Sequence, residues 1–435
     1  MYYSKYGIVK NKLIFLTLVY FISLFSAFAV DVSFFIKEAF KNNPSLKANA
    51  FEVEKEKAAH DSESLFLNAT NINLGYNNIP ISNIPSLDSH MMSNVSIGIS
   101  QNIAFPWESS LRKSAAYEKF ISEKDKFTHK KNVFAYNIRN IYEKLMFLIA
   151  KKEILRKNEK ALENILKTSR ALVSVNRMAS SQLLKIEADI SFINSNILKI
   201  EAETEKKKYE LNLLCGVFFD WVNINLSTAD WIYLSDNIIV PENIDVENTA
   251  LYNQYKNFYE SQKTKESLGY ASLWPSVMLG INYSIRQEIA GKDKGEDFIS
   301  VNASMPFPLH YAYKEKYQII KNEKAAQAAY ENWLNIENDI KMNWQGEKNK
   351  ALLLKEAYKI IEKEVLPKYY ASYMSQVSSL SAGNLTLIDV LDSYRRYLEV
   401  SLEKVKTYYE LRESILKLDY YSENYPAKEN LSNNN

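Results

Sequence analysis

The sequence has 435 residues and a formal net charge of +2, from 54 lysines and arginines against 52 aspartates and glutamates. It contains only ten glycines and ten prolines, and this scarcity of chain breakers favours long helices over a large all-β fold or a turn-rich α/β enzyme. The near-zero charge argues against an electrostatic nucleic-acid binder, and the single cysteine excludes an intrachain disulfide and a cysteine metal cluster.

The first 29 residues are predicted to be a secretory signal peptide. Three lysines precede an apolar run at 13–28, and Ala27-Phe28-Ala29 matches an A-x-A cleavage site. A transmembrane anchor is the alternative, but the run is short for a span of about 20 residues. Removing these residues with their three lysines changes the net charge from +2 to −1, so the slight basicity belongs to the signal.

The remaining chain is predicted to contain two copies of one structural plan, related by a shift of about 207 residues. With this shift Tyr76 coincides with Tyr283, and Leu211 coincides with Leu418. The predicted boundaries are signal peptide 1–29, first repeat 30–215, inter-repeat connection (equatorial region) 216–249, second repeat 250–421 and polar tail 422–435.

Each repeat is predicted to contain a helix, two strands, a long helix and a further helix. Apolar and polar residues alternate at about 70–77, 94–104, 276–286 and 297–306, as in strands with one apolar face. Each segment has roughly the ten residues that a tilted strand needs to cross a bilayer, although a soluble sandwich fits the alternation too. Four strands leave open edges, so closure at eight or more strands requires other subunits.

The long helices are predicted at about Ser109–Val175 and Tyr311–Leu380, each about 100 Å long at 1.5 Å per residue. Pro367 is expected to break the second one. The helix after the first carries an alternating three- and four-residue apolar spacing, as in coiled coils, and seven-residue spacings recur near the C-terminus. The seam residues are Leu183, Ile186, Ile190, Ile193, Ile197, Ile200, Thr204, Lys207, Leu211 and Leu214, then Leu391, Leu398 and Val405, and Leu402, Tyr409 and Leu416.

Four motifs carry a resemblance to a known family. Residues 43–48 read NPSLKA, residues 99–107 and 301–309 form two strand-to-helix corners, and residues 383–396 read GNLTLIDVLDSYRR. In this order and spacing they resemble the TolC-like outer membrane efflux protein family, and the corners resemble its metal-cation branch. The resemblance covers about 31–421.

The resemblance implies a mainly α fold with a small β part, a tandem repeat of long coiled-coil helices plus four amphipathic strands. It implies a homotrimer whose three sets of four strands form a twelve-stranded transmembrane β-barrel. The expected location is the cell outer membrane, with the helical tunnel in the periplasm.

The resemblance also implies a closed periplasmic aperture. Asp389 and Asp392 match an acidic ring, which attracts cations and disfavours anions. Gln182 and Lys185 occupy the corresponding positions of the first repeat, and Lys185 is expected to bridge neighbouring helices. The alternative, which can coexist, is that Asp389 stabilises a helix N-terminus. The tip turns, expected to dock the adaptor, contain Asn176, Ser181, Gly383 and Thr386.

No enzyme site is recognisable in the sequence. The four histidines lack metal-site spacing, and no nucleophile elbow, P-loop or dinucleotide motif occurs. No cofactor or metal is therefore expected. His90-Met91-Met92 is favoured as an ordinary loop over a soft-metal site, and Cys215 as a buried small residue.

The predicted function is a passive exit duct of a tripartite efflux system for metal cations or drugs. The expected partners are a periplasmic adaptor (membrane fusion) protein, an inner-membrane pump of the RND or ABC type and outer-membrane lipid, with no nucleic acid. An exit duct for type I protein secretion is one alternative. A secreted periplasmic coiled-coil scaffold without a barrel is an alternative of another class, and the four alternating strands disfavour it.

Overall fold

The computed structural model of the protein describes most of the chain that follows the predicted signal peptide. The described residues are 31–63, 67–81, 87, 90–175, 179–222, 224, 226, 231, 238–271, 273–274, 276–305, 314–381 and 387–423. The predicted signal peptide and nearly all of the predicted polar tail lie outside these residues.

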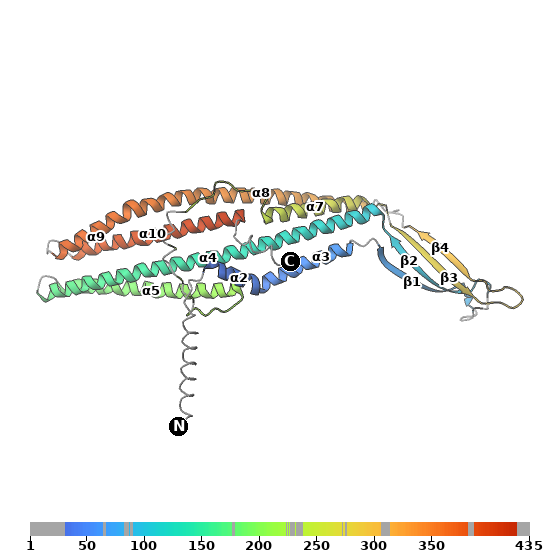
Figure 1. Ribbon diagram of the computed structural model, residues 1–435, viewed down its shortest axis with the longest axis horizontal. Coiled ribbons are helices and arrows are strands. Elements are labelled where there is room, and N and C mark those ends of the chain that lie inside the picture. Colours follow the sequence, from blue (N-terminus) through green and yellow to red (C-terminus); the bar gives the residue numbers. More distant parts are fainter. Residues whose placement is uncertain are drawn as a thin grey trace, which may run out of the picture. The chain divides into compact units, whose positions relative to one another are not determined.

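Long helices make up most of the described chain, together with one small sheet (Figure 1). The first half contains α2 (Val32–Asn42), α3 (Pro44–Glu63), β1 (Leu67–Asn77), β2 (Asn94–Ile103), α4 (Pro106–Ser174) and α5 (Ser180–Cys215). The second half contains α7 (Ala250–Ala271), β3 (Val277–Arg286), β4 (Phe298–Ser304), α8 (Glu315–Ile360), the π-helical turn η3 (Ile361–Val365), α9 (Leu366–Ser381) and α10 (Leu387–Ser422). The expectation of a mainly α fold with a small β part is confirmed.

The chain divides into two compact units, and each unit takes residues from both halves of the sequence. Unit 1 comprises residues 1–47, 130–245 and 340–435, and unit 2 comprises residues 48–129 and 246–339. Helices α4 and α8 contribute residues to both units. The compact units therefore differ from the predicted repeats, which follow the order of the sequence.

The sheet of unit 2 has four antiparallel strands in the order β1-β2-β3-β4. Two hairpins are joined where β2 pairs with β3, so that Ile99 lies beside Ile281 although the two residues are far apart in the sequence. Apart from an irregularity between Leu67 and Thr70 of β1, register is continuous across the sheet, and Ile72, Ile99, Ile281 and Val301 form one row. This register places most apolar positions of the four strands on one face, with Met278 and Phe298 on the other.

Coiled-coil packing forms the core of unit 1, as the seam predicted. Ile186, Ile193, Ile197 and Ile200 of α5 are buried and belong to one apolar cluster, to which α4 and α10 also contribute. Leu391, Val405 and Leu416 are buried on α10, and the other members of its predicted seams pack partly buried against the same cluster. Burial of this stripe is what stabilises helices of such length.

The prediction that Pro367 breaks the helix is wrong. The helix does not end before the proline; it widens into η3, and the backbone N–H of Leu366 donates to the carbonyl of Ile361, five residues earlier. A proline cannot donate to the carbonyl four residues before it and collides with that group in an α-helix. One wider turn relieves this conflict while the chain remains helical.

Asn43 explains the Asn-Pro pair that separates α2 from α3. Its side-chain oxygen accepts hydrogen bonds from the N–H groups of Ser45 (2.8 Å) and Leu46 (3.2 Å), which caps α3. Its amide nitrogen donates to the carbonyl of Leu214 near the end of α5 (2.8 Å). Pro44 occupies the first position of α3, where a missing N–H costs nothing. One buried side chain thus fixes both a helix start and a contact across unit 1.

Candidate functional site

One face of the sheet is apolar and exposed. Leu74 and Val301 are 77% and 75% exposed, and similar side chains continue across all four strands. The exposed set comprises Ile72, Leu74, Tyr76, Val95, Ile97, Ile99, Leu279, Ile281, Tyr283, Ile285, Ile299 and Val301. We call this set the apolar band. A sheet in water normally buries such a face, so the band indicates contact with a different, apolar environment.

The opposite face of the sheet is polar and closely packed. Ser100 and Ser284 are only 5% and 9% exposed. Hydrogen bonds run between strands, from the Asn73 amide to the Ser100 hydroxyl (3.0 Å) and from the Asn282 amide to the Asn302 oxygen (3.3 Å). Amide and hydroxyl groups thus satisfy one another on this face, which is wettable and uncharged along most of its length.

Two glycines make room for this packing. A Cβ atom on Gly98 would lie 1.9 Å from the Asn282 side-chain oxygen and 2.6 Å from the carbonyl of Ile281. A Cβ atom on Gly280 would lie 2.7 Å from the Asn302 oxygen. Each glycine therefore lets the asparagine of the next strand lie flat across the sheet.

The residues predicted for the aperture lie at the starts of two helices of unit 1. Asp389 and Asp392 are exposed in the first two turns of α10, and Asp389 lies in the first turn. Gln182 is half-buried and Lys185 is exposed near the start of α5. Ser181 is exposed beside them, whereas the predicted tip residues Asn176, Gly383 and Thr386 lie outside the described residues.

Arg395 is a charged residue of this region whose role could not be predicted from the sequence. Its guanidinium contacts both carboxylate oxygens of Asp189 on α5 (2.9 and 3.1 Å) and lies 3.5 Å from the Asp392 carboxylate. Within one chain Asp392 thus shares Arg395 with Asp189, while the predicted bridge from Lys185 stays a prediction. The three-residue spacing from Asp392 to Arg395 was visible on the helix, but the pairing across helices was not.

A tyrosine cluster packs α9 and α10 beneath these residues. Tyr394 is fully buried, and its hydroxyl donates to the carbonyl of Asn158 on α4 (3.1 Å). The rings of Tyr373 and Tyr397 stack with centroids 5.8 Å apart. Burial raises the pKa of Tyr394 well above its ordinary value, so the group remains a neutral hydrogen-bond donor.

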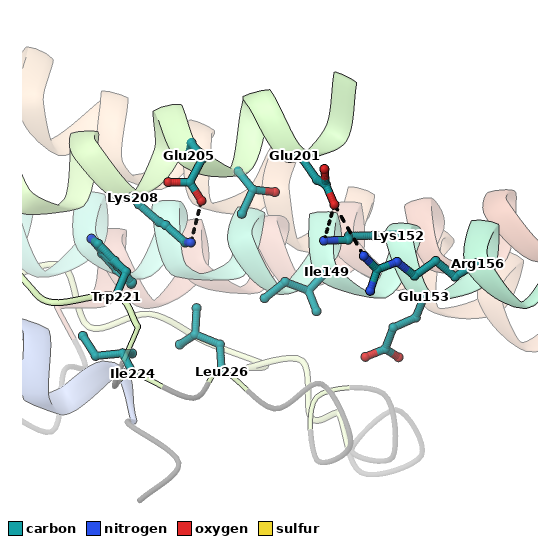
Figure 2. A pocket seen from close by; sticks show the side chains of 11 residues that line it. Ile149, Lys152, Glu153, Arg156, Glu201, Glu205, Lys208, Trp221, Ile224 and Leu226 are labelled. Atoms are coloured by element: carbon teal, nitrogen blue, oxygen red, sulfur yellow. Dashed lines mark hydrogen bonds and ion pairs between the residues drawn. The ribbon is translucent and has the colours of Figure 1, made fainter. Parts of the chain in front are cut away.

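A cavity of about 540 Å³ lies between α4, α5 and the inter-repeat connection, all within unit 1 (Figure 2). Lys152 and Arg156 reach Glu201 at 2.7 and 3.5 Å, and Lys208 reaches Glu205 at 2.6 Å. Trp221, Ile224 and Leu226 of the connection form the apolar side. The basic groups of this cavity are already paired with carboxylates. We therefore interpret the cavity as a packing gap between the connection and the helices.

The thiol and the histidine-methionine segment are accounted for by local contacts. Cys215 is buried and its thiol lies 3.4 Å from the carbonyl of Phe35, and burial raises its pKa to about 12. His90 accepts a hydrogen bond from the backbone N–H of Met92 (3.2 Å). Among the described residues, no three histidine, cysteine, aspartate or glutamate side chains are grouped so as to hold a metal ion.

A search of the described residues finds no helix that is both long and apolar enough to cross a membrane.

Comparison with known proteins gives a likeness of fold. No protein-family model matches the sequence, and no curated protein matches it. Among solved structures, the transmembrane channel protein CusC is 13% identical with a TM-score of 0.74, covering 91% of this chain and 92% of its own. The outer-membrane channel OprN is 11% identical with a TM-score of 0.72, covering 90% and 89%.

A third solved structure agrees with these two. The outer membrane protein VceC of Vibrio cholerae is 14% identical with a TM-score of 0.72, covering 90% of this chain and 94% of its own. The likeness covers nearly the whole described chain, including both the helices and the sheet. The chain therefore has the TolC-like fold of these outer-membrane channels.

Proposed function

We propose that three copies of this chain form an outer-membrane channel that serves as the exit duct of a tripartite efflux system. The sheets of three chains, with four strands each, would close into a twelve-stranded barrel, and the helices would form a periplasmic tunnel. The observation that carries this proposal is the exposed apolar band, combined with the fold shared with CusC, OprN and VceC.

The apolar band supports a lipid-facing sheet. A soluble sheet would leave a dozen large apolar side chains in water, and each loses roughly 1 kcal/mol or more compared with burial. In a bilayer this face contacts hydrocarbon, while the polar face lines a water-filled lumen. Exposed aromatic residues lie toward both ends of the sheet, with Trp107 and Trp274 near the helices, and with Tyr76 and Tyr283 of the band toward the other end. Such rings favour the two membrane interfaces.

Self-association is supported by the edges of the sheet. Within the described chain, β1 pairs with β2 alone and β4 with β3 alone, so each outer strand leaves one edge open. Exposed backbone N–H and carbonyl groups are untenable in lipid, and pairing β1 of one copy with β4 of the next removes both edges.

Exposed apolar stripes on the helices of unit 1 support the same assembly. One stripe on α5 lies opposite its buried seam, and a second follows α8 and α9. The stripes comprise Leu184, Phe192, Leu198, Tyr209 and Leu213 on α5, and Met342, Leu353, Ile360, Tyr370 and Met374 on α8 and α9. A neighbouring copy that places one stripe against the other would cover both.

The partners follow from a passive duct. The duct would dock a periplasmic adaptor protein at its helical tip, near Ser181 and the other predicted tip residues, and the adaptor would connect it to an inner-membrane pump that supplies the energy. Metal cations or drugs are the proposed substrates, in preference to secreted proteins. Deletion of the gene followed by a toxicity panel of metals, dyes and antibiotics tests the substrate class.

Location and assembly are tested together by fractionation. We expect the protein in the outer-membrane fraction, running as a trimer in mild detergent and as a monomer after boiling. Reconstitution in planar bilayers should then give discrete conductance steps. A protein found only in the soluble periplasmic fraction would contradict the duct and favour the coiled-coil scaffold.

The aperture is tested by replacing its carboxylates. We propose that Asp389 and Asp392 of three chains form an acidic ring at the periplasmic end, opposite Gln182 and Lys185. The double variant Asp389→Ala/Asp392→Ala should raise conductance or reduce block by divalent cations in planar bilayers. Unchanged conductance together with unchanged block would exclude the gate and leave only the stabilisation of the helix start.

A further inference from the structure

The strands of the sheet contain a single charged residue. No aspartate, glutamate, lysine or arginine occurs in β1, β2 or β4, and β3 contains only Arg286, its last residue. Arg286 follows Asn282 and Ser284 at two-residue spacing, so its side chain belongs to the polar face. Apart from the apolar Met278 and Phe298, the other groups of that face are neutral amides, hydroxyls and glycines.

Arg286 is paired and largely buried at the end of β3. Its side chain is only 7% exposed and forms an ion pair with Asp293. The guanidinium also lies 4.7 Å from the ring centroid of Phe298. Asp297 accepts a hydrogen bond from the backbone N–H of Arg286 (3.1 Å) and another from the Tyr283 hydroxyl.

The loop between β3 and β4 holds these groups in place. Ile289 and Asp293 form a β-bridge, with hydrogen bonds of 2.9 and 3.1 Å between their backbones. Gly295 has a φ of +69°, and a Cβ atom there would lie 2.5 Å from the Glu288 nitrogen. The loop is thus folded tightly against the strand end, and Asp293 is brought back onto Arg286 by this fold.

We propose that the outer cluster, defined as Arg286 and Asp293, sets the charge selectivity of the outer part of the duct. This inference rests on the proposed function, because the polar face lines the lumen only in the assembled channel. A wall of neutral amides and hydroxyls offers the same surface to cations and anions, so discrimination requires fixed charge. The duct wall itself would pass solutes of either sign.

The charges of the cluster balance one another. One guanidinium and one carboxylate give no net charge in each chain, and Glu288, Lys292, Lys294 and Glu296 of the loop also cancel one another. Asp297 lies on the other face of the strand end, where its carboxylate accepts from the hydroxyl of Tyr283 in the apolar band. The cluster should therefore keep the outer duct close to non-selective, and loss of either partner should unbalance it.

Two substitutions with opposite expected effects test the cluster. Asp293→Asn removes one carboxylate per chain and should shift the reversal potential in a KCl gradient toward the value of an anion-selective channel. Arg286→Gln removes the guanidinium and should shift the reversal potential toward the value of a cation-selective channel. At low salt, each variant should change the potassium-to-chloride permeability ratio roughly twofold. The change should be much smaller at 1 M salt, where the ~3 Å Debye length screens the charges.

Two further variants serve as controls in the same bilayer experiment. Glu288→Gln makes the same change of charge as Asp293→Asn, in the same loop but outside the cluster, and should shift the ratio less. Asn282→Asp places a carboxylate midway along the polar face and should shift the ratio toward cations if that face lines the lumen. Each variant is first checked for a boiling-sensitive trimer, so that a misfolded protein is recognised.

The outcomes separate this inference from the proposed function. If Asn282→Asp shifts the ratio while Asp293→Asn and Arg286→Gln leave it unchanged, the duct stands and the role of the cluster is overturned. If Glu288→Gln shifts it as much as Asp293→Asn, the charge of the whole loop acts and the cluster has no special role. If the wild-type protein forms neither trimers nor channels, the proposed function itself fails.

Discussion

The helical bundle of unit 1 buries its apolar side chains, whereas the sheet of unit 2 exposes them. In the bundle, Leu162 of α4 and Leu211 of α5 are fully buried, while charged side chains such as Glu356 and Arg396 are exposed. In the sheet, Leu74 and Val301 are exposed, while Ser100 and Ser284 are buried against their neighbours. The same chain thus follows the rule for a water-soluble protein in one region and the reverse rule in the other.

This difference indicates that the two regions meet different surroundings. A buried leucine stabilises the bundle because water is excluded from it. An exposed leucine stabilises the sheet only if the medium outside is apolar, and buried amides are tolerated only because they bond to one another. Four predictions test this contrast, beginning with the largest expected effect.

A lysine in the apolar band should have the largest effect. Ile281→Lys places a charge in the apolar band on β3, which would cost about 2–4 kcal/mol per chain if the band faces the bilayer centre. We expect loss of the boiling-sensitive trimer from the outer-membrane fraction. Ser300→Lys on the polar face of β4 is the matched control and should preserve the trimer. Equal tolerance of both lysines would mean that the band does not face lipid.

A cavity in the bundle should have the next largest effect. Leu162→Ala removes a fully buried side chain of α4 and should lower the free energy of unfolding by about 2–5 kcal/mol. Urea denaturation followed by circular dichroism at 222 nm measures this loss. Val222→Ala, at a site that is almost fully exposed, should change the stability by less than about 0.5 kcal/mol.

Filling the space beside a sheet glycine should have a smaller effect. Gly98→Ala introduces a Cβ atom against Asn282 and should destabilise the protein by about 1–3 kcal/mol. Gly346→Ala on α8 meets nothing within 4 Å and should instead stabilise it by about 0.5–1 kcal/mol. The melting temperature of the detergent-solubilised trimer measures both. A stabilising Gly98→Ala would show that the polar face is loosely packed.

The smallest effect is expected from a polar contact at the π-helical turn. Burial opposes ionisation of Glu362, but Lys404 (2.8 Å) and the Tyr358 hydroxyl (2.9 Å) outweigh it and lower its pKa from the ordinary value of 4.5. A lowered carboxyl pKa gives stability that is present above pH 4.5 and disappears as the pH falls through the folded-state pKa.

Comparison of the wild type with Glu362→Gln tests this contact. Near neutral pH the variant should be less stable by about 1 kcal/mol, and the difference should vanish in acid. Urea midpoints measured as a function of pH give the result. Glu356→Gln, which removes an exposed pair with Lys359, is the control and should show a smaller pH dependence, because solvent screens this pair. A difference that persists in acid would exclude the ionised pair as its source.

Local patterns of the sequence predicted the elements and their faces. The seven-residue repeat of Ile186, Ile193 and Ile200 marked the seam of α5, because helix periodicity is a property of neighbouring residues. The alternation around Ile97 and Ile281 marked the apolar faces of strands for the same reason. Pro367 marked an irregularity, but whether a helix breaks or widens depends on what packs around it, and α10 packs against η3 and α9 there.

Contacts between distant residues were beyond the sequence. The pairing of β2 with β3 places Ile99 beside Ile281, and this pairing could not be predicted from the sequence of either strand. Arg395 could be expected to approach Asp392 on its own helix, but not Asp189 on α5. Likewise, the sequence around Asn43 does not predict that its side-chain amide donates to the carbonyl of Leu214.

The sequence by itself determined where the helices and strands lie and which face of each is apolar, since these properties depend on the spacing of residues along one element. Only the tertiary structure decided how the polar groups are used. It set the amide and hydroxyl contacts across the sheet, the space at Gly98 and the return of Asp293 onto Arg286. Such contacts depend on strand register and loop closure, which arise when separate elements meet.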